Sequence, residues 1–182
     1  MPLGDDFAAV IEAARSGSER AIARLYLDLQ PMLLRYLAVR AGDAAEDLAQ
    51  ETWASAAQQL HRFEGDEAMF RSWFFTIAHR RWVDHCRRNA RRRDIATEPD
   101  AMEPLVTALG DVDRLAANDA IQALIAPMTE EQAEIILLRV VAGLSVDEVA
   151  RIVGKKPGAV RVVQHRALKR AAAALEQGTV TP

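Results

Sequence analysis

The chain has 182 residues, half of them hydrophobic, and a formal net charge of −3 at pH 7. This length fits one domain or two small ones, and this apolar content can fill real cores. The N-terminus is acidic, unlike a secretory signal, and no apolar run approaches the ~20 residues that a membrane helix needs, so we expect no membrane insertion. A single cysteine, Cys86, excludes an internal disulfide and favours a cytoplasmic protein.

The small net charge hides an uneven distribution of charge along the chain. Residues 79–93 hold seven Arg and one Asp, and residues 151–170 hold seven basic residues and no acid. Between them, residues 94–119 hold seven acids and one Arg. Two basic blocks separated by an acidic segment predict two surfaces that can meet phosphate, with the acidic segment available to shield them when no nucleic acid is bound.

The residue pattern predicts an all-α fold. Ala, Leu, Arg and Glu dominate, and no segment of strand length alternates apolar and polar residues convincingly. Pro31 predicts a break or kink inside the second helix. Asp43 and Thr129 are in position to act as N-caps, and Gln132 completes a capping box with Thr129. In chain order, the expected helices are 5–16, 18–41, 44–61, 67–91, 112–126, 130–142, 146–153 and 157–175.

The pattern also divides the chain into two small helical domains. Residues 94–110 contain two prolines, four acids and no basic residue, a composition typical of a linker. We therefore expect an N-terminal domain over residues 1–93, a flexible acidic linker over 94–111 and a C-terminal domain over 112–182.

The first N-terminal feature beyond core packing is an acidic stripe. Residues 42–53 contain no Lys or Arg. Three of their acidic side chains are spaced at i, i+4 and i+8, namely Asp43, Asp47 and Glu51, with Glu46 and Gln50 on a neighbouring edge. Like charges four residues apart mildly destabilise a helix. The stripe therefore indicates either a docking surface for a basic partner or an ordinary solvated helix face.

The second N-terminal feature is a cluster of aromatic residues. Seven of the ten aromatic residues lie within residues 53–82 and run directly into the Arg-rich block. Most must be core, and Phe70, Trp73 and Ile77 share one helical face. Aromatic rings interleaved with Arg also suit single-stranded nucleic acid, because bases stack on rings while Arg follows phosphates. The loop 63–69, with its Gly and Asp, can shape a pocket for an unstacked base.

Residues 143–170 predict a helix-turn-helix. Ser145 and Glu148 form a capping box, Gly154 ends the first helix, and Pro157 suits the first turn of the second. The second helix has a basic face made by Arg161, His165 and Lys169, and an apolar face made by Val160, Val163 and Ala167. In a helix-turn-helix the second helix enters the DNA major groove. The alternative is an ordinary helical hairpin with a solvated basic face.

With these motifs in place, the chain resembles a bacterial RNA polymerase sigma factor of the sigma-70 family, in the compact extracytoplasmic-function (ECF) group. The stretch 47–53, DLAQETW, resembles the polymerase-binding helix of the family. The stretch 63–82, FEGDEAMFRSWFFTIAHRRW, resembles its −10 recognition and melting segment. The stretch 129–170 resembles its −35-binding domain, and the order of the three motifs matches the family.

The resemblance implies partners and a role for each motif. The implied partners are core RNA polymerase (the clamp coiled coil of its largest subunit, and its flap), promoter DNA, and an anti-sigma factor. The promoter would be duplex at −35 and single-stranded at −10. The implied polymerase contacts are Asp47, Gln50 and Glu51. The implied −10 residues are Phe63, Gly65, Asp66, Phe70, Trp73, Arg80 and Arg81. The implied −35 residues are Lys155, Lys156, Arg161, Val162, His165 and Arg166.

Two of these residues depart from the family pattern. Relatives often have Asn at the position of Arg80 and a polar residue such as Ser at that of Val162. Val162 can contact a thymine methyl group but can neither donate nor accept a hydrogen bond. The base preferences at both elements therefore stay open.

Two other classes of protein are alternatives to this resemblance. A stand-alone helix-turn-helix regulator binds duplex DNA without polymerase, but it gives no reason for the acidic stripe or the aromatic helix. An enzyme is not indicated, because the sequence has no Gly-rich phosphate loop, paired metal-ligand motif or nucleophile elbow. We accordingly expect no catalytic residue, no metal and no cofactor.

Overall fold

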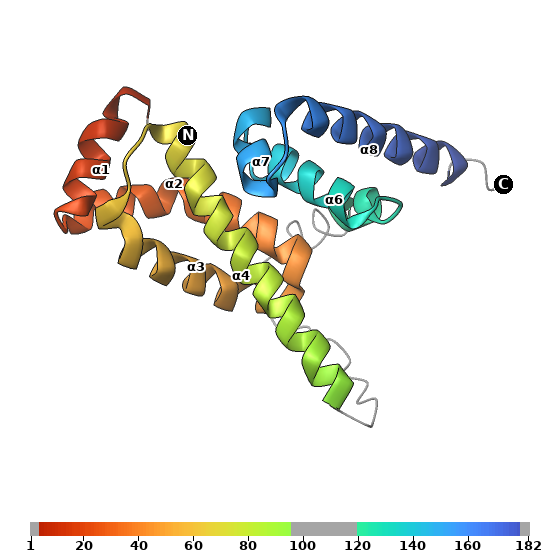
Figure 1. Cartoon of the computed structure of the whole chain (residues 1–182), viewed down its shortest axis with the longest axis horizontal. Helices are drawn as coiled ribbons and strands as arrows, with labels where there is room; N and C mark the ends of the chain where they lie inside the picture. The colour runs from red at the N-terminus through yellow and green to blue at the C-terminus, as the bar shows by residue number, and fades with distance from the viewer. Residues whose placement is uncertain (1–3, 96–119, 179–182) are drawn as a thin grey trace.

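All regular structure is helical in the computed structural model, which describes residues 4–95 and 120–178 (Figure 1). The α-helices are α1 (Phe7–Arg15), α2 (Glu19–Ala41), α3 (Ala45–Gln59), α4 (Glu67–Ile95), α6 (Glu130–Ile136), α7 (Val146–Val153) and α8 (Pro157–Gly178). Short 3-10 turns cover Gly4–Asp6, Gly42–Ala44 and Leu60–Arg62, and a π-helical segment, η4 (Leu137–Val141), continues α6. Residues 120–125 are also helical.

The predicted all-α class is confirmed. The expected acidic linker, and the first part of the helix expected over 112–126, fall mainly on residues outside those described. Of the helices described, none combines the length and the apolar character needed to cross a membrane.

Helix α2 continues through Pro31, so the predicted break is absent. Ser18 begins this helix, because its side chain accepts a hydrogen bond from the Ala21 N–H. Proline removes one intrahelical donor. Leu29 and Leu33, on either side of it, are fully buried, and the packing of that face holds the helix together across the missing bond.

The predicted N-cap at Asp43 is wrong. The chain instead makes a 3-10 turn over Gly42–Ala44, and α3 begins after Ala44 without a side-chain capping bond. Gly42 has a φ of +53°, in the left-handed region that glycine adopts without steric cost. It ends α2 and turns the chain so that α3 packs back on α2. The turn, rather than a cap, determines where α3 starts.

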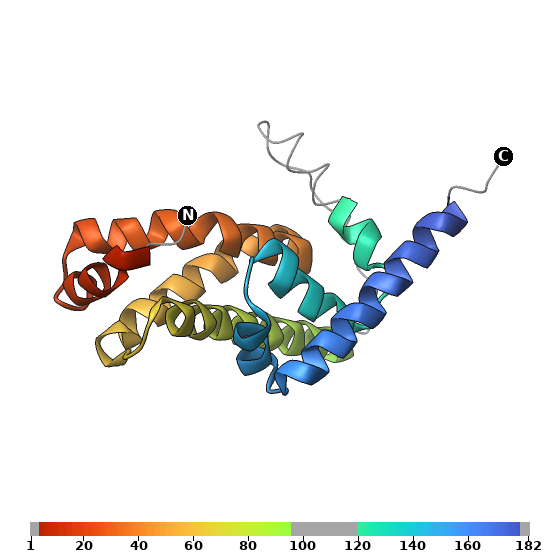
Figure 2. The same ribbon diagram turned by 90° about the horizontal axis from the view of Figure 1, so that it is seen from above.

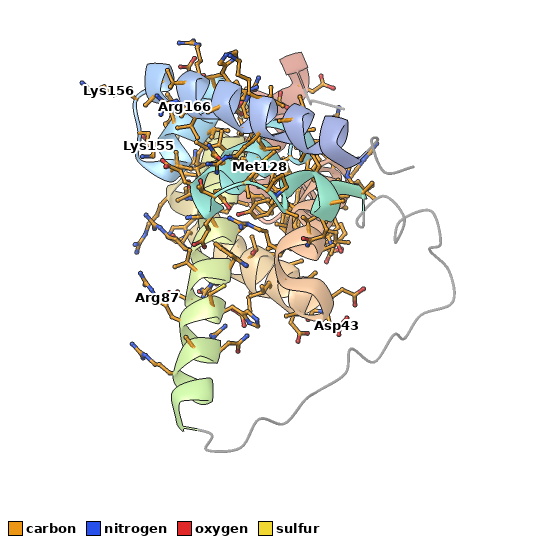
Figure 3. The ribbon with its side chains drawn as sticks, turned by 90° about the vertical axis from the view of Figure 1, so that its right-hand side faces the viewer. Asp43, Arg87, Met128, Lys155, Lys156 and Arg166 are labelled. Carbon is orange, nitrogen blue, oxygen red and sulfur yellow. The ribbon has the colours of Figure 1, made fainter. Side chains whose placement is uncertain are left out.

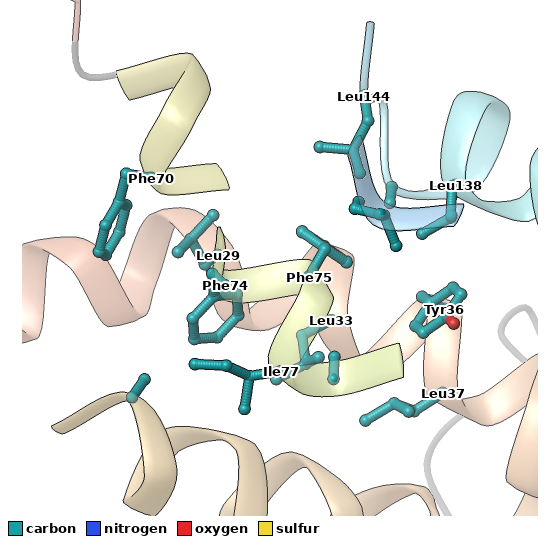
Figure 4. Close-up of a cluster of buried hydrophobic side chains, with 14 of the residues drawn as sticks. Leu29, Leu33, Tyr36, Leu37, Phe70, Phe74, Phe75, Ile77, Leu138 and Leu144 are labelled. Atoms are coloured by element: carbon teal, nitrogen blue, oxygen red, sulfur yellow. The ribbon is translucent and has the colours of Figure 1, made fainter. Parts of the chain in front are cut away.

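The N-terminal domain, α1–α4, is built around the apolar faces of α2 and α4. Leu29, Leu33 and Leu37 of α2 share one buried cluster with Phe74 and Ile77 of α4 (Figure 4). Burial of side chains of this size stabilises a fold by about 1.5–3 kcal/mol each. The aromatic helix is therefore held mainly by its core face, as the sequence predicts.

The C-terminal domain, residues 120–178, forms the predicted helix-turn-helix. Both predicted capping boxes are present, at Thr129 for α6 and at Ser145 for α7. Gly154 ends α7 in the left-handed conformation, with a φ of +67°. The C-terminal end of α8 extends beyond the other helices (Figures 1 and 2).

The two domains pack against each other in this structure. Helix α7 lies along α4, and η4 lies against α2. Leu138 and Leu144 are fully buried in one cluster with Tyr36 and Phe75, so a single apolar core crosses the boundary between the domains (Figure 4).

Candidate nucleic-acid interface

Helix α8 presents a basic face to solvent. Val160 and Ala167 are fully buried and fix the opposite face of the helix against the domain core. The predicted −35 residues on this helix are all exposed: Arg161, Val162, His165 and Arg166. A helix held by one apolar side, with Arg side chains on the other, has the form that a major groove accepts.

The turn before α8 adds two exposed lysines, Lys155 and Lys156. Both project to the same side of the molecule as Arg87 of α4, whereas Asp43 lies on the other side (Figure 3). Lys155 Nζ lies 2.5 Å from Glu131 Oε1, with both side chains about half exposed. Exposed ion pairs contribute little to stability, so this lysine can exchange its carboxylate for a phosphate.

Arg139 fixes the orientation of the recognition helix, a role that the sequence pattern missed. Its Nε donates a hydrogen bond to Gln164 Oε1 at 3.3 Å, and its Nη1 donates to the carbonyl of Leu144. One side chain of η4 thereby joins α8 to the start of the helix-turn-helix. The sequence carries no signal for this contact, because Arg139 and Gln164 are 25 positions apart.

The predicted −10 aromatics form a packed cluster at the N-terminal end of α4. Ring centroids lie 5.2 Å apart for Phe63 and Phe70, and 5.3 Å apart for Phe63 and Trp73. Phe63 and Phe70 are 8% and 2% exposed, while Trp73 is half-buried. In this arrangement Phe63 and Phe70 support the surface from behind, and Trp73 offers part of its ring to it.

The loop before α4 has the sharp turn that its Gly predicts. Gly65 has a φ of +147°, and a Cβ there would lie 2.8 Å from Met69 Sδ, so any other residue would be strained and crowded. Asp66 begins α4, since its Oδ1 accepts a hydrogen bond from the Met69 N–H at 2.7 Å. Met69 is itself 49% exposed and forms an apolar rim beside the loop.

The two predicted arginines on α4 differ in their surroundings. Arg80 is exposed. Arg81 is half-buried, and its Nη2 donates a hydrogen bond to Ser55 Oγ at 2.5 Å. Arg81 therefore joins α4 to α3, while Arg80 projects into solvent.

The acidic stripe on α3 is not uniform. Asp47 and Gln50 are exposed, but Glu51 is half-buried, and its Oε1 lies 3.8 Å from Arg88 Nη2 of α4. The segment itself has no basic residue, yet the fold supplies one from the Arg block. Glu51 Oε2 is buried without a hydrogen bond among the described residues, which leaves one strong acceptor unused.

Glu134 of α6 is buried against the N-terminal domain. Tyr36 donates a hydrogen bond to its Oε1 at 2.7 Å, His79 Nδ1 lies 2.9 Å from the same oxygen, and Arg40 pairs with Oε2. Burial raises the pKa of a carboxyl, but the hydrogen bond with His79 and the charge of Arg40 outweigh it, so the pKa of Glu134 lies below its ordinary value. Burial, followed by the Glu134 charge, raises the pKa of Tyr36 well above its ordinary value. At neutral pH the pair is a carboxylate and a phenol.

Known proteins match this chain in both domains. Residues 25–92 match Sigma-70 region 2, and residues 118–170 match Sigma-70, region 4. The ECF RNA polymerase sigma factor ShbA of Streptomyces griseus is 36% identical over 181 residues, which cover 93% of this chain and 95% of that protein.

Two solved structures share the fold. CnrH, solved in complex with the cytosolic domain of CnrY, superposes with a TM-score of 0.71 at 21% identity, over 95% of this chain and 99% of that one. The sigma factor RpoE of Bartonella quintana, solved in complex with the anti-sigma factor NepR, superposes with a TM-score of 0.66 at 22% identity, over 86% and 98% of the two chains.

The chain has two packed helical domains, and the second carries a helix-turn-helix with an exposed basic face. This is the architecture of a DNA-binding transcription protein. The matches to both regions and to ShbA define it further: the chain belongs to the sigma-70 family of RNA polymerase sigma factors, in the ECF group. It is an initiation factor and not an enzyme.

Proposed function

We propose that this chain binds core RNA polymerase and directs it to promoters that carry matched −35 and −10 elements. Sigma-70 regions 2 and 4 follow each other on one chain, and this single observation carries the proposal. Residues 1–93 serve polymerase binding and the −10 element, residues 112–182 serve the −35 element, and residues 94–111 connect them. The polymerase performs the catalysis.

At the −35 element, the exposed face of α8 reads duplex DNA. Arg161 and Arg166 carry guanidinium groups that can bind guanine in a bidentate manner, and Val162 offers an apolar surface to a thymine methyl group. His165 adds a third polar side chain on the same face. Lys155 and Lys156 meet phosphates, which position the helix without reading sequence.

At the −10 element, the N-terminal end of α4 captures an unpaired strand. Trp73 and the Gly65–Asp66 loop form the rim of the site, and Phe63 and Phe70 support it from the core. Arg80 follows the phosphates from its exposed position. Arg81 contributes by holding α3 and α4 at a fixed spacing through Ser55.

The polymerase contact lies on α3. Asp47 and Gln50 are exposed and meet the clamp coiled coil of the largest subunit directly, while region 4 meets the flap. Glu51 is 41% exposed at its side chain and lies beside Arg88, so a basic partner can reach its exposed part, while the buried Oε2 stays inside the domain.

An anti-sigma factor is a further protein partner in this proposal, because the solved relative RpoE is bound to one. Action on core polymerase and chromosomal promoters requires the protein to be in the cytoplasm. A stand-alone regulator would have no use for a region 2 domain.

Reconstitution with purified core polymerase tests the proposal. The protein should comigrate with core polymerase before any DNA is added, and the holoenzyme should protect paired −35 and −10 elements in a genomic footprint. Binding of duplex DNA by the free chain, with no association with core polymerase, would instead favour the stand-alone regulator.

A further inference from the structure

The contact between the two domains is centred on one buried carboxylate. Glu134 is 5% exposed, and it is the only member of its cluster that comes from the C-terminal domain. Tyr36 and Arg40 come from α2, and His79 comes from α4. The N-terminal domain thus supplies three groups that converge on one anion.

The donor set on the N-terminal domain is larger than one carboxylate can use. The Arg40 side chain is only 9% exposed. Its guanidinium carbon lies 3.9 Å from the Trp82 ring centroid. Its Nε is buried with no hydrogen-bond partner among the described residues. Arginine prefers planar or tetrahedral oxyanions that engage two of its N–H groups together. A phosphate group, with more oxygens than a carboxylate, can satisfy this set better than Glu134 does.

A second set of polar contacts between the domains also includes a carboxylate of the C-terminal domain beside an arginine of the N-terminal domain. Arg71 of α4 lies 3.9 Å from Glu148 of α7 and 3.7 Å from Asp28 of α2. Arg151 of α7 donates a hydrogen bond to Ser72 Oγ at 2.8 Å. Carboxylates of the C-terminal domain therefore cover two cationic side chains of the N-terminal domain, around the apolar core that the domains share.

The packed arrangement does not fit the geometry of a promoter. Elements centred roughly 25 base pairs apart are about 85 Å apart along B-form DNA. Helix α4 has 29 residues and is the longest of the described helices, yet it is only about 43 Å long. Domains that pack directly on each other through α4 and α7 must separate before both elements are bound.

We propose that Tyr36, Arg40 and His79 form a binding site for a backbone phosphate of promoter DNA, and that Glu134 occupies this site while the two domains are closed on each other. This inference rests on the proposed function for the identity of its ligand. Removing one member of a buried ion pair is strongly destabilising because it leaves the other charge uncompensated. The carboxylate therefore acts as a latch, and DNA replaces it on opening.

The latch is tested in the full-length protein with Glu134→Gln, which removes the charge and keeps the shape. The matched control is Glu130→Gln, an exposed acid on the same helix. Fluorophores at Ala57→Cys and Ala172→Cys, two exposed positions in different domains, report the distance between them in a Cys86→Ser background. Energy transfer should fall for Glu134→Gln and stay at the wild-type level for Glu130→Gln. Wild-type transfer in both variants would overturn the latch.

The phosphate site is tested with a fluorescent −10 single strand and no polymerase. Glu134→Gln should bind it tighter than wild type, by on the order of tenfold. Adding Arg40→Gln should remove most of this gain and lower the slope of log affinity against log salt by about 0.7, the value for one phosphate contact on a single strand. Arg40→Lys should keep the slope, because it keeps the charge, but recover only part of the gain in affinity, because lysine cannot engage two phosphate oxygens in the planar arrangement of a guanidinium. If adding Arg40→Gln to Glu134→Gln changes neither the affinity nor the salt slope, Arg40 does not contact a phosphate and the proposed site is wrong.

The two arms separate this inference from the proposed function. The energy-transfer experiment needs no DNA and no polymerase, so it reports closure whatever the protein does. Failure to bind core polymerase would remove the proposed function and leave the measured closure intact. Circular dichroism of each variant before use verifies that the helices are retained.

Discussion

Arg139→Met should loosen the recognition helix without touching DNA. The substitution removes the bond from Nε to Gln164, 3.3 Å long, and the bond from Nη1 to the Leu144 carbonyl, while Met keeps the apolar stem. Hydrogen bonds of a charged group contribute about 1.5–3 kcal/mol each. Arg139 is only half-buried and one bond is long, so we expect the free energy of unfolding to fall by about 1–3 kcal/mol in total.

Two measurements on the same variant decide whether Arg139 positions the helix or binds DNA. Urea denaturation gives the loss of stability, and anisotropy with a −35 duplex gives the affinity at several salt concentrations. Affinity should fall because α8 is less well held, but the slope against log salt should stay at the wild-type value. A slope smaller by about one would mean that Arg139 contacts a phosphate directly, and it would refute the positioning role. Arg20→Met, an exposed change on α2, controls for the loss of one positive charge away from the recognition helix.

Gln50→Ala combined with Glu51→Lys should abolish binding to core polymerase and leave helical content unchanged; unaltered affinity in a pull-down would remove α3 from the interface. Arg161→Ala should weaken −35 binding by about 1–3 kcal/mol and relax its sequence preference, whereas Lys155→Ala should weaken matched and scrambled duplexes equally and flatten the salt dependence. Because the pKa of Glu134 is lowered in the folded protein, its contribution to stability is full above the ordinary Glu value of about 4.3 and is lost as pH falls through the lower folded value. Urea denaturation between about pH 3 and 6 should therefore show a steeper loss of stability in wild type than in Glu134→Gln, and parallel curves would contradict this.

Sequence reasoning succeeded where the determining contact is local. The capping boxes at Thr129 and Ser145 each join residues three positions apart, and Gly154 ends α7 through its own backbone conformation. Such features depend on neighbours that the sequence displays. The exposed basic face of α8 follows from the same logic, because helical period alone separates it from Val160 and Ala167.

The sequence-based predictions were wrong or incomplete where contacts with a distant part of the chain determine the local structure. Asp43 has the composition of an N-cap, but the turn at Gly42 and the packing of α3 on α2 place the helix start elsewhere. Glu51 looked unpaired until the fold brought Arg88 beside it. Glu134 lies in the helix expected over 130–142, but nothing in that segment indicates its Tyr36 partner, which is 98 positions away.

The basic face of α8 stays exposed while the domains are packed together. A closed chain can therefore be captured by duplex DNA through the C-terminal domain alone, with the approach accelerated by opposite charge. From that moment the N-terminal domain is tethered beside the same duplex, at an effective concentration set by the connecting chain rather than by the amount of protein in solution. The rate of promoter search then depends on the concentrations of both protein and DNA. Engagement of the −10 strand follows within the bound complex, at a rate that does not depend on protein concentration. The two steps could be tuned by mutation independently of each other.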